Sequence, residues 1–209
     1  MRPRLIVIAG PNGSGKTSLT RSLQKRGYDF GAYINPDDTA ATLEGSYEDR
    51  VRRAQALTTQ WRQEAIVARK NFSYETVFSH PSKLGELEAA RATGFEITLL
   101  FVGIDNPDIN VERVRTRVQL GGHDVPEDRV IARYQRTMGM LPDMVERTDR
   151  AIVFDNTVQS TDPAAFNGRV VAQCIAHGDG IAVKLRSPIP AWTNRYLVEH
   201  ARRRGWSIG

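Results

Sequence analysis

The stretch that decides the fold is Gly10-Pro11-Asn12-Gly13-Ser14-Gly15-Lys16-Thr17. It follows Leu5–Ala9, a short continuous apolar run that is typical of a strand buried on both faces of a parallel sheet. After it, a helix is expected from Lys16 to about Lys25, ending at Gly27. A buried strand, a glycine-rich loop and a helix in immediate succession predict an α/β fold.

The same stretch fits the pattern G-x-x-x-x-G-K-[ST], which indicates a phosphate-binding loop, or P-loop. Its glycines let backbone N–H groups approach phosphates, and the following helix presents its positive N-terminus to the same anions. Lys16 is expected to reach the β- and γ-phosphates, and the Thr17 hydroxyl to ligate Mg²⁺. The predicted ATP-binding residues are Gly10, Pro11, Asn12, Gly13, Ser14, Gly15, Lys16, Thr17 and Ser18. The loop alone fits ATP or GTP, and a GTPase switch is disfavoured because no guanine-reading Asn-Lys-x-Asp follows a later strand.

Beyond this loop, strand and helix signals alternate along the chain. Further strands are predicted at Ala32–Ile34, Phe72–Val77, Phe95–Val102 and Ala151–Phe154. Helices are predicted at Ser46–Lys70, Lys83–Ala92, Pro107–Gln119 and from the loop Gly121–Pro126 to Arg147, with a kink or split at Pro142. This order predicts a P-loop NTPase-type three-layer sandwich, with a mainly parallel five-stranded sheet and helices on both faces.

Two details of this prediction can be tested directly. In the helix from Ser46, the stripe expected to face the core is Val51, Ala54, Leu57, Trp61, Ala65 and Ala68. From about Asp162 onward the pattern weakens, and Val170–Ile175 and Ile181–Leu185 are candidates for a small added strand pair, with a final helix at Trp192–Arg204.

Length and composition predict one domain in a reducing cytoplasm. A chain of 209 residues fits a single domain, with a core at about 1–160 and a C-terminal extension at 161–209. No apolar run approaches the roughly 18 residues of a membrane-spanning helix. The N-terminal residues also lack the pattern of a signal peptide. The single Cys174 excludes an internal disulfide framework.

The net charge of +5 suits a polyphosphate ligand or a nucleic acid. No basic tail with interleaved aromatic residues is present, which argues against nucleic acid. Arginines gather at Arg113, Arg115 and Arg117, at Arg129, Arg133 and Arg136, and at Arg202–Arg204, where a solvated helix end is the simpler interpretation.

Several motifs in this order resemble the zeta toxins and their stand-alone relatives, which are small bacterial P-loop kinases. The matching segments cover roughly the first 157 residues and are Gly10–Thr17, Ile34–Asp37, Ser73–Thr76, Arg113–Arg117, Gly121–Pro126 and Val153–Asn156. The resemblance implies ATP-dependent phosphorylation of a hydroxyl on a small molecule, first of all the nucleotide sugar UDP-N-acetylglucosamine. It also implies an antitoxin protein as a possible partner.

The resemblance further suggests roles for individual residues. Asp37 would be the catalytic base and a substrate contact, although it could instead cap a helix, a role that Asp38 or Thr39 could share. Glu75 would hold substrate hydroxyls, the alternative being a surface glutamate. Asp155-Asn156 would frame the adenine site or simply form a turn that ends a strand.

The arginine clusters are expected to form a lid over the transferring phosphoryl group. Arg113 and Arg117 share one helical face, and Arg117 is closest to the lid arginine of the family. Arg129, Arg133 and Arg136 share another face, from which Arg133 is the second choice. The second lid arginine of the toxins is replaced near His123, as in the stand-alone relatives.

Two other functions remain open at this stage. One is a kinase that acts on a nucleoside or a dinucleotide cofactor. The other is a nucleotide-dependent switch or ATPase that binds nucleic acid through its basic surface.

Overall fold

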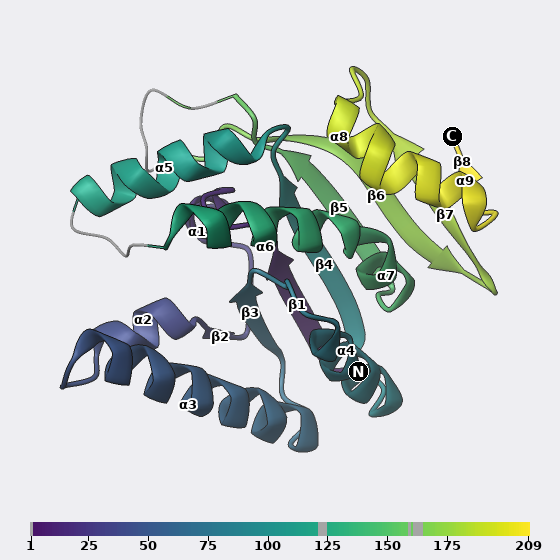
Figure 1. Ribbon diagram of the computed structural model, residues 1–209. Helices are drawn as coiled ribbons and strands as arrows, with labels where there is room; N and C mark the ends of the chain where they lie inside the picture. The colour runs from purple at the N-terminus through teal and green to yellow at the C-terminus, as the bar shows by residue number, and fades with distance from the viewer. Residues whose placement is uncertain (1, 121–124, 159, 161–164) are drawn as a thin grey trace.

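The computed structural model describes residues 2–120, 125–158, 160 and 165–209 (Figure 1). Within them, one eight-stranded sheet has the order β2-β3-β1-β4-β5-β6-β7-β8. The strands are β1 (Arg4–Ala9), β2 (Ala32–Ile34), β3 (Phe72–Thr76), β4 (Glu96–Gly103), β5 (Arg150–Asp155), β6 (Arg169–His177), β7 (Gly180–Leu185) and β8 (Ser207–Ile208). β1 to β5 pair in parallel, which confirms the predicted parallel sheet.

The sheet is wider than the five predicted strands because the C-terminal extension adds to its edge. β6 pairs antiparallel with β5, β7 pairs antiparallel with β6, and β8 runs parallel to β7. The expected strand pair is therefore present and continues the main sheet. The two-residue β8 carries no run of alternating side chains from which it could have been predicted.

Helices cover both faces of the sheet, as expected. They are α1 (Lys16–Lys25), α2 (Pro36–Ala41), α3 (Tyr47–Val67), α4 (Leu84–Ala92), α5 (Pro107–Gln119), α6 (Glu127–Gly139), α7 (Leu141–Glu146), α8 (Ala191–Thr193) and α9 (Glu199–Arg203). Alternate residues of β1 belong to different core clusters: Val7 to one that includes residues of α3, α4, α6 and α7, and Ile8 to one that includes Leu19 of α1. The break between α6 and α7 lies just before Pro142, where the sequence predicts it.

The buried side of α3 differs from the predicted stripe. Trp61 is 41% exposed, whereas Arg62 is only 4% exposed. Arg62 donates to Glu86 of α4 through Nε at 3.0 Å and lies 5.0 Å from the centre of the Tyr74 ring. These contacts compensate the burial of a charge, and they come from partners far along the chain that periodicity does not reveal.

The C-terminal extension packs onto the core through Trp192 of α8, which is 2% exposed. Its ring lies so close to Gly103 at the end of β4 that a Cβ there would be 2.4 Å from a ring carbon. Its indole Nε1 donates to Asp155 at 3.1 Å. A π-helical turn at Asn194–Val198 links α8 to α9, so the predicted final helix is present with one widened turn. Among the described helices, none is both long and apolar enough to cross a bilayer.

Candidate active site

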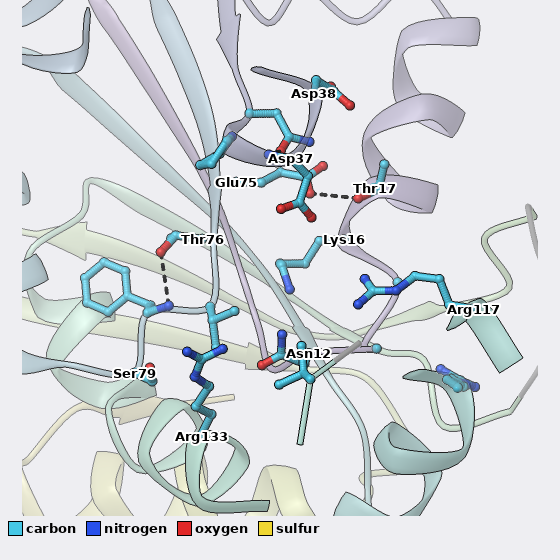
Figure 2. A pocket seen from close by; sticks show the side chains of 18 of the residues that line it. Asn12, Lys16, Thr17, Asp37, Asp38, Glu75, Thr76, Ser79, Arg117 and Arg133 are labelled. Carbon is cyan, nitrogen blue, oxygen red and sulfur yellow. Dashed lines mark hydrogen bonds between the residues drawn. The ribbon is translucent and has the colours of Figure 1, made fainter. Parts of the chain in front are cut away.

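The loops that follow β1 to β5 meet at one edge of the sheet, because parallel strands all end on the same side. Residues that follow β1, β2, β3 and β5 line a cleft of about 1360 Å³, to which α5 and α6 also contribute side chains. The cleft brings together the six side chains to which the sequence assigns chemistry: Lys16, Thr17, Asp37, Glu75, Arg117 and Arg133 (Figure 2). The cleft is also lined by Asn12, Gly13, Gly15 and Ser18. The remaining residues of the loop, Gly10, Pro11 and Ser14, are buried and do not line the cleft.

Lys16 lies at the centre of the cleft, where its ammonium group donates 2.9 Å hydrogen bonds to the carbonyl oxygens of Gly10 and Pro11. Burial lowers the pKa of Lys16 to about 8, and the negative charges of Glu75 and Asp37 only partly oppose this shift. The N-cap of α1, which begins at Lys16, is Gly15, and a glycine has no side chain with which to cap the first N–H groups of the helix, which suit an anion.

Glu75, at the end of β3, organises the hydroxyl groups around the loop. One carboxylate oxygen accepts hydrogen bonds from Tyr33 at 2.6 Å and from Thr20 at 2.8 Å, and the other accepts from Thr17 at 2.9 Å. The side chain is 8% exposed and lines the cleft. Burial, together with the negative charge of Glu75, raises the pKa of the Tyr33 phenol. Three hydroxyl donors thus fix this carboxylate beside the expected metal ligand Thr17.

Asp37 is an exposed carboxylate in the cleft rather than a helix cap. The N-cap of α2 is Asn35, whose side chain accepts a hydrogen bond from the Asp37 N–H at 2.9 Å. Pro36 occupies the first helical position, so Asp37 follows it in the first turn. Figure 2 shows Asp37 on the side of Lys16, while Asp38 points away from it. The capping alternatives at Asp37, Asp38 and Thr39 are therefore not used here.

The arginines approach the cleft from two helices. Figure 2 shows Arg117 of α5 and Arg133 of α6 directed into it from two sides. The positive charge of Arg117 contributes to the lowered pKa of Lys16, which places the two groups within electrostatic range. Arg129 also lines the cleft, whereas Arg136 of α6 is exposed outside it.

Arg113 is held differently, since it donates to the Thr157 carbonyl at 3.2 Å and burial lowers its pKa. It lies on α5 beside Gly13 of the loop. The expectation for His123 concerns residues 121–124, which lie outside the described part of the chain.

Two buried asparagines contact the phosphate loop from outside. Asn110 of α5 donates its side-chain N–H to the Asn12 carbonyl, and Asn156 donates to the Ser14 carbonyl at 2.8 Å. From the sequence, Asn156 is expected either to contact adenine or to form a turn. No motif in the sequence indicates a role for Asn110, which appears there only as a polar residue inside a predicted helix. Thr20 and Tyr33, which hold Glu75, also carry no motif.

Comparison with known proteins identifies relatives of this chain. Residues 1–164 match the family described as Zeta toxin. A protein of Haemophilus influenzae (strain ATCC 51907 / DSM 11121 / KW20 / Rd), described as uncharacterized, is 31% identical over 139 residues, which are 64% of this chain and 94% of that protein.

Two solved structures show the same fold at low sequence identity. A chain of the PezAT toxin–antitoxin system of Streptococcus pneumoniae has a TM-score of 0.57 and 15% identity, over 74% of this chain and 68% of that chain. A chain of the AvrRxo1-ORF1:-ORF2 complex with ATP has a TM-score of 0.59 and 15% identity, over 83% of this chain and 59% of that chain.

Proposed function

Because the chain belongs to the zeta toxin family of P-loop kinases, we propose that it transfers the γ-phosphate of ATP to a hydroxyl group of a small molecule. The observation that carries the proposal is the pairing of Asp37 and Lys16 in one cleft. Asn35 caps α2, which leaves the Asp37 carboxylate available to accept the proton of an attacking hydroxyl. Lys16 would neutralise the phosphates that this hydroxyl attacks.

Two observations support a nucleotide at the phosphate loop. The N-cap of α1 is Gly15, which has no side chain to compete with a phosphate, and Gly13 and Gly15 both line the cleft. The AvrRxo1 complex, which shares the fold, was solved with ATP, and this supports the choice of nucleotide. Arg117 and Arg133 would stabilise negative charge on the transferring phosphoryl group, because guanidinium donors are planar and permanently charged.

Magnesium is the metal that this site would accept. Thr17 donates its proton to Glu75, which leaves the lone pairs of the Thr17 oxygen for a hard cation. A bound Mg²⁺ would neutralise charge on the phosphate chain. Glu75 would hold the Thr17 hydroxyl in this orientation and could also contact a substrate hydroxyl from the cleft side.

For the acceptor, a nucleotide sugar such as UDP-N-acetylglucosamine is the first choice, and a nucleoside or a dinucleotide cofactor is the alternative. We further propose that residues 1–209 act as one domain in the cytoplasm. The PezAT chain belongs to a toxin–antitoxin system, so an antitoxin is a reasonable partner to seek.

An acceptor screen tests the proposal. The protein is incubated with ATP and Mg²⁺, and ADP formation and phosphorylated product are followed for UDP-N-acetylglucosamine, nucleosides, NAD and a single-stranded polynucleotide. Acceptor-dependent ADP in stoichiometric amounts with a phosphorylated small molecule supports the proposal. ATP hydrolysis that responds only to the polynucleotide would refute it in favour of the nucleic-acid switch.

A further inference from the structure

Two asparagines from different elements hold the phosphate loop at two peptide groups, one on each side of the Gly13–Ser14 peptide. Asn110, in the first half of α5, is 0% exposed, and Asn156, directly after β5, is 7% exposed. Asn110 donates to the carbonyl oxygen of Asn12, and Asn156 donates to that of Ser14 at 2.8 Å. Both donors therefore act on the backbone of the loop rather than on its side chains.

Because the peptide bond is planar, these two hydrogen bonds also orient the N–H groups of the residues that follow. In a trans peptide, the carbonyl oxygen and the N–H of the next residue point in opposite directions. A donor that holds the Asn12 oxygen therefore also sets the direction of the Gly13 N–H. In the same way, the contact at Ser14 sets the direction of the Gly15 N–H. Gly13 and Gly15 both line the cleft, so the two peptide groups that the asparagines hold lie at the wall of the space that a phosphate would fill.

The two glycines allow the asparagines to come this close. A Cβ at Gly13 would lie 2.8 Å from the Asn110 carbonyl oxygen, and a Cβ at Gly15 would lie 2.4 Å from the Asn156 side-chain nitrogen. Their φ angles of +71° and +94° are in the left-handed region that favours glycine. These glycines thus fit the loop against α5 and the end of β5, in addition to making room for phosphate.

We propose that Asn110 and Asn156 are positioning residues that preorganise the Gly13 and Gly15 N–H groups for the phosphate chain of the nucleotide. This inference rests on the proposed binding of ATP at the loop. Without either side chain, a loop carbonyl loses its donor and the peptide group is free to rotate. The N–H group must then be reoriented whenever a nucleotide binds, which weakens binding. The loss of affinity should be larger for nucleotides that place more phosphates on the loop.

Nucleotide affinity distinguishes this role from general support of the fold. The variants are Asn110→Ala, Asn156→Ala and Asn156→Leu, the last of which keeps bulk but removes the donor. Dissociation constants for ATP, ADP and AMP are measured by calorimetry, with AMP measured by competition. The control is Thr148→Val, which removes another buried donor to a backbone carbonyl, that of Val145 at 3.0 Å.

We expect each asparagine variant to weaken ATP and ADP by about tenfold, the loss of one well-placed hydrogen bond, and AMP by less than about twofold. Thr148→Val should leave all three affinities unchanged. Equal losses for the three nucleotides, or wild-type affinities in folded variants, would overturn the inference. If the wild type binds neither ATP nor ADP, the proposed function itself fails. Failure of the proposed function can therefore be told apart from failure of the role proposed for the two asparagines.

Discussion

The hydroxyl of Thr17 donates a 2.9 Å hydrogen bond to Glu75, which joins the last residue of the phosphate loop to the end of β3. The same carboxylate accepts from Thr20 and Tyr33, so it is held on three sides. This arrangement fixes the orientation of the Thr17 oxygen before any ligand binds. The binding of a magnesium–nucleotide complex should therefore depend on a residue that belongs to a different strand.

The variant Glu75→Gln tests this dependence. Its amide can still accept from Thr20 and Tyr33, but the NH₂ group would face Thr17 and occupy the lone pairs that a cation needs. We expect the Mg²⁺-dependent gain in ATP affinity to fall by about tenfold, while ATP binding in EDTA stays near that of the wild type. An unchanged Mg²⁺ dependence would show that Thr17 does not need this partner.

The lowered pKa of Lys16 makes nucleotide binding depend on pH. In the free protein the pKa is about 8, so Lys16 is increasingly neutral above that pH. The negative phosphates of a bound nucleotide favour the charged form and raise the pKa, so binding takes up a proton at about pH 9. ATP affinity should therefore fall as the pH rises above about 8.

Calorimetry in buffers with different ionisation enthalpies measures this proton uptake directly. Lys16→Met provides the control, since it removes the group and should abolish the uptake. If the wild type binds ATP at about pH 9 without taking up a proton, the assignment of Lys16 as the phosphate contact is contradicted.

The catalytic effect of Arg117 on α5 and Arg133 on α6 can be distinguished from a general effect of charge by a control arginine, Arg136, which also lies on α6. Arg117→Ala and Arg133→Ala should each lower kcat by about 10²–10³, the loss typical of one group that stabilises transition-state charge. Arg136→Ala, which removes an exposed arginine outside the cleft, should stay within about twofold of the wild type under the same criterion. Steady-state rates with the acceptor found in the screen provide the measurement. Equal losses in all three variants would point to a general effect of charge.

Trp192 tests whether the C-terminal extension is part of one cooperative unit. Trp192→Ala removes a buried ring packed on Gly103 and should cost about 3–5 kcal/mol of unfolding free energy. Trp192→Phe loses the hydrogen bond to Asp155 and part of the ring that packs on Gly103, and should cost less than Trp192→Ala because an aromatic ring remains. Chemical denaturation should show one transition in every variant. Two separate transitions would mean that residues 161–209 unfold independently.

Local patterns in the sequence predict most of the elements. The strand, loop and helix from Arg4 to Lys25 follow from an apolar run, glycines and a helical stretch that neighbour one another. The Ser46 cap of α3 and the break before Pro142 are likewise local, since each depends on one residue and its own backbone.

Features that depend on distant partners could not be predicted. The burial of Arg62 requires Glu86 and Tyr74, which lie on other elements. The exposure of Trp61 follows, because the two neighbours on α3 cannot both face the core. The strand pair β6 and β7 is predicted from local patterns, but its pairing with β5 and the third added strand, β8, depend on distant partners that residue composition does not reveal.

For the cleft, motifs indicate the residues that would touch the ligand but not those that support them. Lys16, Asp37 and Arg117 belong to recognisable segments, and the fold gathers them. Asn110 and Asn156 act on backbone atoms of a loop that precedes them by 98 and 142 residues, so their function becomes visible only when the chain is folded.

The most direct test concerns Asp37. Asp37→Asn keeps the shape of the side chain and removes its ability to accept a proton, and Asp38→Asn makes the same change at the next residue. With the acceptor identified by the screen, transfer is measured in a single turnover at saturating ATP. We expect Asp37→Asn to slow transfer by about 10²–10⁴ with ATP affinity preserved, the range for loss of a general base, and Asp38→Asn to remain near the wild type. Transfer by Asp37→Asn at the wild-type rate would contradict the assignment of Asp37 as the base.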